Sequence, residues 1–239
     1  EHSYITFRMK DFSPSSFIIK DIIKVGLPAS MSMIIMSFGQ LVFNRILVHF
    51  STDVVAAYQI GGRIDMLIFL PMFSISYGLS TLVGMFFGAN RKGKLKQIII
   101  YGLSRSFMIA VITSTVVYIT APYFAALFTP NIFIQDTSVQ YLRLMAFIYP
   151  FIAVALPCGR ILQGFGLGLP MLVITLCRVL LVATPLSWFF IFVQHKPVEW
   201  VWYSMMISAG ISFIVAVSWV IWAIKKYTIQ STGVQYAKT

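Results

Sequence analysis

The sequence has 239 residues, of which 59% are hydrophobic and only 10% are charged, and its formal net charge is +11. Soluble globular domains carry about 25% charged residues, so this composition argues against a soluble fold and favours an integral membrane protein. The basic residues punctuate apolar runs instead of clustering on polar segments with spaced aromatics, which argues against nucleic-acid binding.

The chain opens with a polar segment, residues 1–16, that has no signal-peptide pattern and starts at Glu1. We therefore expect a fragment or a processed product. Residues 14–24 alternate apolar and charged positions at helical spacing, with Ser16 as a plausible cap, which predicts an interfacial helix. Residues 1–24 are expected to form a cytoplasmic segment before the first span.

Six segments are long and apolar enough to cross a membrane, which needs about 20 residues. Short polar connections with turn compositions separate them, so neighbours are expected to be antiparallel. This predicts an all-α integral membrane lobe over 25–226 and a cytoplasmic tail over 227–239. The expected spans are about 25–50, 54–87, 97–127, 137–164, 170–193 and 199–224.

Basic residues around the spans predict the orientation, because cytoplasmic loops retain positive charge. One side of the predicted bundle holds Arg8, Lys10, Lys20, Lys24, Arg91, Lys92, Lys94, Lys96, Lys225, Lys226 and Lys238, whereas the opposite loops hold only Lys196. Both termini are therefore expected in the cytoplasm, in a multi-pass protein of the plasma (inner) membrane. Aromatic belts agree, with Trp200, Trp202 and Tyr203 expected at the outer interface and Trp219, Trp222 and Tyr227 at the inner one.

Ionisable residues deep in a membrane are functional candidates, because inserting each costs about 2.5–3.5 kcal/mol. Arg45, Arg105, Arg143 and Arg160 lie near enough to span ends for their stems to reach the interface, which is the simpler interpretation. Arg63 and Asp65 lie deeper in the second span and, being two residues apart, face different partners. They are interpreted as ion-coupling groups or as members of structural ion pairs.

Two polar stripes are interpreted as walls of a substrate cavity. Asp65 shares a helical face with Tyr58 and Met72 on the second span, and polar groups recur at spacings of three and four on the first span, beside flexible methionines. Interhelical hydrogen bonding alone would also explain the polar face of the first span. The expected cavity residues are Met33, Met36, Ser37, Gln40, Asn44, Tyr58 and Met72.

Patterns typical of enzymes and metal sites were not found. His2, His49 and His195 are dispersed near loops, and no Gly-flanked serine or phosphate-binding glycine loop occurs. We therefore expect neither an enzyme nor a metal centre.

Three motifs resemble the second lobe of MATE (multidrug and toxic compound extrusion) transporters, over about 17–226. The first is Gly26-Leu27-Pro28 followed by Thr52-Asp53-Val54-Val55-Ala56-Ala57-Tyr58-Gln59-Ile60. The second is Arg63-Ile64-Asp65, Leu70-Pro71, Gly84 and Gly88-Ala89-Asn90. The third is Leu162-Gln163-Gly164-Phe165-Gly166 with Pro170 and Arg178.

The resemblance implies helices seven to twelve of a twelve-helix exporter, with the fold of the MOP flippase superfamily and an N-terminal six-helix lobe as partner. Residues 1–24 would then be the cytoplasmic linker between the two lobes. The resemblance also implies export of cationic or amphipathic compounds in exchange for Na+ or H+, with no other cofactor. Met36 stands where the bacterial Na+ exporters carry a glutamate, and the chain looks closer to the DinF-like branch. That resemblance implies a coupling aspartate in the first helix of the other lobe, with Asp65 in an assisting or structural role.

Two alternatives remain open at this point. A lipid-linked precursor flippase of the same superfamily would use Arg45, Arg63 and Arg178 to bind a pyrophosphate headgroup. A non-transporting six-helix membrane subunit would bind partners and move no solute.

Overall fold

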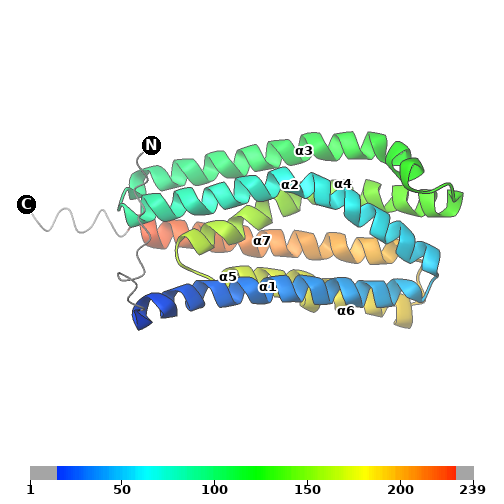
Figure 1. Cartoon of the computed structure of the whole chain (residues 1–239), viewed down its shortest axis with the longest axis horizontal. Helices are drawn as coiled ribbons and strands as arrows, with labels where there is room; N and C mark the ends of the chain where they lie inside the picture. The colour runs from blue at the N-terminus through cyan, green and yellow to red at the C-terminus, as the bar shows by residue number, and fades with distance from the viewer. Residues whose placement is uncertain (1–14, 230–239) are drawn as a thin grey trace, which may run out of the picture.

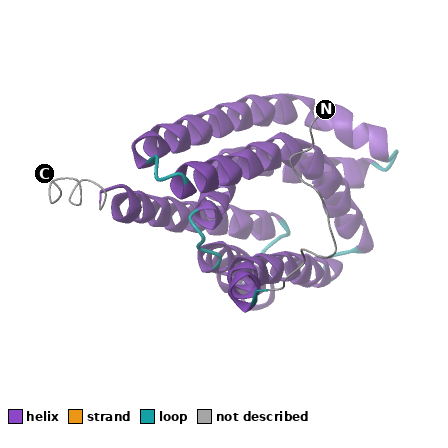
Figure 2. Cartoon of the chain, turned by 60° about the vertical axis from the view of Figure 1, so that its left-hand side comes forward, coloured by secondary structure: helices purple, strands orange, loops and turns teal. Residues whose placement is uncertain are grey.

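A computed structural model of the chain describes residues 15–229. Six helical spans run side by side in an elongated bundle (Figure 1), which confirms the predicted all-α membrane fold. Five of the spans are each a single α-helix: α1 (Ser16–Val48), α2 (Thr52–Gly88), α3 (Leu95–Phe128), α4 (Ile132–Gly164) and α7 (Glu199–Ile229). The connections between them are short, and Figure 2 shows helices and loops only in the described part of the chain.

The fifth span, 169–193, is helical throughout but changes its hydrogen-bonding pattern three times. It consists of α5 (Leu169–Leu176), the π-helix η3 (Cys177–Ala183), α6 (Thr184–Trp188) and the π-helix η4 (Phe189–Val193). Pro170 stands in the first turn of α5, where a missing N–H costs little, and Pro185 stands inside the continuous span, at the change from η3 to α6. A short 3-10 turn, η2 (Lys92–Lys94), connects α2 to α3.

The first helix is longer than the sequence indicated. α1 runs without a break from Ser16, so the expected interfacial segment and the first span form one continuous helix. The predictions for 1–14 and 230–239, among them the cytoplasmic location of Arg8, Lys10 and Lys238, concern residues outside the described part of the chain. The division into segment, lobe and tail therefore stays a prediction.

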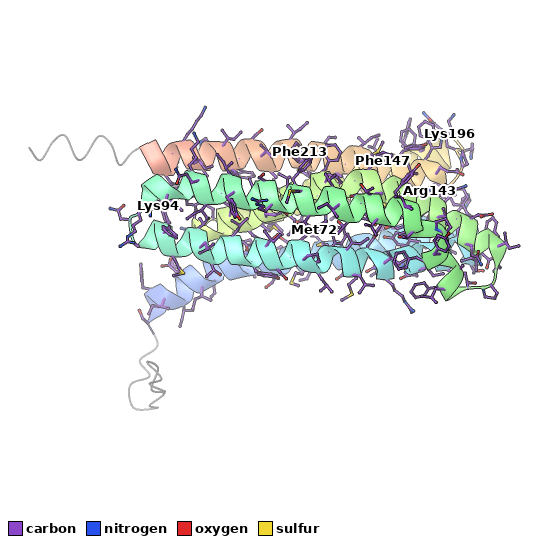
Figure 3. The ribbon with its side chains drawn as sticks, turned by 90° about the horizontal axis from the view of Figure 1, so that it is seen from above. Met72, Lys94, Arg143, Phe147, Lys196 and Phe213 are labelled. Atoms are coloured by element: carbon purple, nitrogen blue, oxygen red, sulfur yellow. The ribbon has the colours of Figure 1, made fainter. Side chains whose placement is uncertain are left out.

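Most of the basic residues that flank the spans lie at one end of the bundle. The start of α1, the α2–α3 turn and the end of α7 lie together at one end, which we call the terminal end, and the α1–α2, α3–α4 and α6–α7 turns lie at the other, the distal end (Figure 1). Lys94 marks the terminal end and Lys196 the distal end in Figure 3. At 1.5 Å per residue, the 33 residues of α4 extend about 50 Å, so both of its ends project beyond a hydrocarbon core of about 30 Å.

The fourth helix is the centre of the fold. α4 packs against α2, α3 and α7, and 61% of its most apolar window is buried, compared with 17–33% in the other spans. Its buried face contacts large apolar side chains of α2 and α7, among them Met72 and Trp202. α1 instead packs mainly against α5, so one face of α1 remains uncovered.

Proline interrupts α4 twice, and a serine of α3 compensates for one interruption. Pro157 has no N–H to donate to the carbonyl of Ala153, four residues earlier. The Ser106 hydroxyl of α3 donates to that carbonyl over 2.6 Å. A neighbouring helix therefore supplies the donor that the proline removes, which satisfies a buried acceptor and joins α3 to α4.

Candidate functional site: a buried carboxylate between α2 and α4

Asp65 lies in the transmembrane core, 13 residues after the start of α2, or about 20 Å along the helix. Its side chain is 7% exposed. Because an unpaired charge in such a place costs several kcal/mol, the side chain needs specific partners.

Two tyrosines of α4 are those partners. The Tyr141 hydroxyl donates to Oδ2 of Asp65 over 2.6 Å, and the Tyr149 hydroxyl donates to Oδ1. The two tyrosines are eight residues apart, or about 12 Å along α4, so they approach the carboxylate from opposite directions along the helix. Each carboxylate oxygen therefore accepts one hydrogen bond from the same neighbouring helix.

The residues of α2 four positions before and four positions after Asp65 pack against the two tyrosines. Gly61 lies against the ring of Tyr141, and a Cβ atom there would stand 2.3 Å from two ring carbons. On the other side, Phe69 meets the ring of Tyr149 edge-on, with centroids 5.6 Å apart. The absence of a side chain at Gly61 thus lets Tyr141 lie close to α2, where its hydroxyl reaches Asp65.

An aromatic shell closes the site from α7. Trp202 is fully buried and lies 4.9 Å from the ring of Tyr141, centroid to centroid. It also stacks on Tyr58, with centroids 5.8 Å apart. Within residues 15–229 the indole N–H of Trp202 has no acceptor. We call Tyr58, Asp65, Tyr141, Tyr149 and Trp202 the carboxylate cluster.

In the described part of the chain, the Asp65 carboxylate has no positively charged partner. No basic side chain among the described residues lies within salt-bridge distance of Asp65, and two neutral hydroxyls are its hydrogen-bond donors. Hydrogen bonds from neutral donors compensate only partly for burying a charge. The carboxylate is therefore suited to take up a proton or a small cation.

The candidate residues of the second span have different surroundings in the structure. Arg63 is exposed whereas Asp65 is buried, as expected for side chains two positions apart on a helix. Met72 is fully buried in the core and does not line an open wall, so its assignment to a cavity is corrected. Tyr58 is half-buried, and its ring packs within the carboxylate cluster.

The polar face of α1 lies on the uncovered side of the lobe. Met33, Met36, Ser37 and Gln40 are exposed, and Asn44 is half-buried. The Gln59 side chain of α2 donates to Oδ1 of Asn44 over 3.0 Å, close to the α1–α2 turn. Among the described residues, no hydrogen bond joins this polar face of α1 to the carboxylate cluster.

Sequence reasoning missed three members of the cluster. Tyr141 and Tyr149 stand in an apolar span where aromatic residues are common, and only their eight-residue spacing hints at a shared partner. The outer-interface level of Trp202 stays a prediction, whereas the structure shows that its ring is fully buried against Tyr141. Arg160 was expected to extend to the interface, but its guanidinium donates to the Tyr77 hydroxyl over 2.9 Å and to Oε1 of Gln163 over 3.0 Å.

The described part of the chain holds no cluster of side chains typical of a metal centre. No group of three or more His, Cys, Asp or Glu side chains gathers there.

The chain resembles known multidrug transporters in sequence. The MatE family model matches residues 28–189. A probable multidrug resistance protein, NorM, of Thermotoga maritima is 24% identical over 200 residues, covering 81% of this chain and 43% of that protein. The multidrug export protein MepA of Staphylococcus aureus is 27% identical over 139 residues, covering 58% of this chain and 31% of that protein.

Solved structures agree with the fold. An outward-facing multidrug resistance MATE family transporter of the MOP superfamily superposes with a TM-score of 0.89 at 26% identity, covering 94% of this chain and 51% of that one. A MOP superfamily transporter from Pyrococcus furiosus, whose binding pocket is described as having reverse polarity suggestive of a different function, gives the same TM-score, identity and coverage. The chain thus spans about half the length of the proteins it matches.

Proposed function

The chain belongs to the MatE family of membrane transporters, and we propose that it is the C-terminal half of a secondary active multidrug exporter. In this proposal the exporter exchanges cationic or amphipathic compounds for Na+ or H+. Its partner is an N-terminal six-helix lobe, and the two lobes provide alternating access across the plasma membrane. The basic residues at the terminal end support a cytoplasmic location for both termini.

One observation carries the proposal: Asp65 is buried without a cationic partner in the described chain, between two tyrosine hydroxyls of another helix. Binding of a proton or cation would neutralise the carboxylate and weaken its acceptance of those hydrogen bonds. The packing of α2 against α4 would then depend on ion occupancy. A transporter needs such a dependence in order to couple ion movement to a conformational change.

The proposed substrate surface is the uncovered face of α1 and the adjoining start of α2. Ser37 and Gln40 provide hydrogen-bonding groups there, and the exposed Met33 and Met36 provide flexible apolar contacts. Such a mixture suits amphipathic compounds of varied shape. Because the relatives are about twice as long, we propose that the missing lobe faces this surface and completes the substrate site.

The test is ethidium efflux from energised vesicles that contain the full transporter, with Na+ and pH gradients imposed separately. Efflux driven by one gradient is expected, and it identifies the coupling ion. Asp65→Asn is expected to abolish gradient-driven efflux, whereas Asp136→Asn, which removes a carboxylate from an exposed position on α4, is expected to preserve it. Gln40→Ala is expected to weaken ethidium recognition without removing the gradient dependence. Wild-type efflux that ignores both gradients would refute antiport.

A specific observation also favours a second candidate, the lipid-linked precursor flippase. Arg160 is half-buried and stacks on Tyr77, with its charged carbon 4.3 Å from the ring centroid. No carboxylate of residues 15–229 pairs with it, and its Nε and the side-chain nitrogen of Gln163 are buried without acceptors. An anionic headgroup would supply them. Arg160→Gln would then abolish translocation of a pyrophosphate lipid while leaving ethidium efflux intact.

A further inference from the structure

A groove runs between α3 and α4 on the outside of the lobe, with a volume of about 320 Å³. It is separate from the carboxylate cluster and shares no residue with it. Figure 3 shows Arg143 and Phe147, on α4, toward the distal end. The groove is lined by Val111, Ser114, Thr115, Tyr118, Ala146, Phe147 and Pro150.

One polar atom in the groove has no partner. Ser114 is 7% exposed, and its hydroxyl has no hydrogen bond within residues 15–229. Ser106, eight residues earlier on the same helix, shows the alternative, because its hydroxyl reaches the backbone of α4 directly. A buried hydroxyl without a partner costs about 1–3 kcal/mol, so the groove favours a ligand with a polar atom at the level of Ser114.

A cation without a counterion stands at the distal rim of the groove. The exposed Arg143 holds its charged carbon 5.4 Å from the ring centroid of Tyr118, which in turn meets Phe147 edge-on at 5.8 Å. No carboxylate among the described residues is within salt-bridge distance of Arg143. The rim therefore presents an oriented guanidinium whose hydrogen-bonding groups are free for an anion.

The charged, polar and apolar residues of the groove follow one another along the helices in the order of the headgroup, interfacial and hydrocarbon layers of a bilayer. If α4 is centred on the hydrocarbon core, Arg143, 11 residues after its start, lies about 6 Å inside the core boundary, from where its side chain reaches the headgroup level. Ser114 and Ala146 come next in depth. Val111 and Pro150 lie deepest, where the lining is apolar.

We propose that this groove binds one anionic phospholipid from the surrounding bilayer. The phosphate pairs with Arg143, and an ester carbonyl accepts a hydrogen bond from the Ser114 hydroxyl. The acyl chain lies along Val111, Phe147 and Pro150. The sequence of cation, hydrogen-bond donor and apolar wall follows the order of phosphate, ester and hydrocarbon in such a lipid. A guanidinium free of carboxylates favours an anionic headgroup over a zwitterionic one.

Native mass spectrometry of the purified protein in mild detergent tests this, with dioleoyl phosphatidylglycerol and dioleoyl phosphatidylcholine added separately. One phosphatidylglycerol is expected to be retained at about tenfold lower concentration than phosphatidylcholine, as a charge-assisted hydrogen bond predicts. Arg143→Gln is expected to remove this preference. Phe147→Ala is expected to weaken both lipids by a similar factor, because it removes a wall that contacts hydrocarbon.

The matched control is Arg105→Gln. Like Arg143, Arg105 is exposed and stacks on a tyrosine, but it belongs to α3 and does not line the groove. Its charged carbon lies 5.1 Å from the ring centroid of Tyr101. Arg105→Gln is expected to keep the lipid preference, and Arg143→Lys to keep part of it, which separates charge from loss of folding. Equal retention of the two lipids by the wild type, equal effects of Arg105→Gln and Arg143→Gln, or displacement of phosphatidylglycerol by ethidium would each overturn the proposal.

Discussion

The Tyr141 hydroxyl donates to Asp65 over 2.6 Å, and this hydrogen bond joins the central helix α4 to α2 in the middle of the apolar core. The same ring lies against Gly61, one turn before Asp65. A polar contact and a close backbone approach therefore fix the same pair of helices.

Tyr141→Phe is expected to destabilise the protein by about 1–3 kcal/mol, because it leaves one oxygen of a buried carboxylate without its donor. Thermal unfolding in detergent measures the loss, and Tyr123→Phe, at a position that is 78% exposed, is the control. In the Asp65→Asn background the cost of Tyr141→Phe should change, because residues in one hydrogen-bond network are not additive. Strict additivity would show that the two side chains act independently.

Gly61→Ala is expected to destabilise the protein by about 1–3 kcal/mol, the usual cost of overpacking, because the new methyl group would displace the Tyr141 ring. The next residue is the matched control, since a Cβ at Gly62 meets no atom within 4 Å. Gly62→Ala should be neutral or slightly stabilising. Equal melting temperatures for the two variants would contradict the close approach of Tyr141.

Ser106→Ala is expected to cost about 1–3 kcal/mol, because the carbonyl of Ala153 then has neither the serine nor the residue-157 N–H as a donor. The exposed Ser104 provides the control, as Ser104→Ala. Combining Ser106→Ala with Pro157→Ala should recover part of the loss, since residue 157 regains an N–H. A double variant less stable than both single variants would argue against this pairing.

Gln59→Ala and Asn44→Ala are expected to have similar, small effects on stability, of about 0.5–1.5 kcal/mol, because each breaks the same exposed hydrogen bond near the α1–α2 turn. The double variant should cost little more than either single one. Unfolding midpoints of the three proteins measure this. Fully additive losses would mean that the two amides stabilise the lobe through other contacts.

The sequence was sufficient for the spans and for the deep position of Asp65 within the second span, because apolar length and distance from a helix end are local properties. It could not reveal the partners of Asp65, which are 76 and 84 residues away and look like ordinary aromatic residues. Met72 was assigned to a cavity wall, and the aromatic neighbours of Trp202 were missed, for a related reason. Helical spacing gives a shared face but does not say whether that face meets another helix, lipid or an open surface.

If Asp65 couples ion movement to transport, its replacement should affect two modes of ethidium movement differently in vesicles containing the full transporter. Asp65→Asn is expected to lose accumulation driven by a Na+ or pH gradient while keeping exchange of labelled for unlabelled ethidium without a gradient. That result would assign coupling, and not substrate binding, to the carboxylate. Gradient-driven accumulation by Asp65→Asn at the wild-type rate would contradict the account.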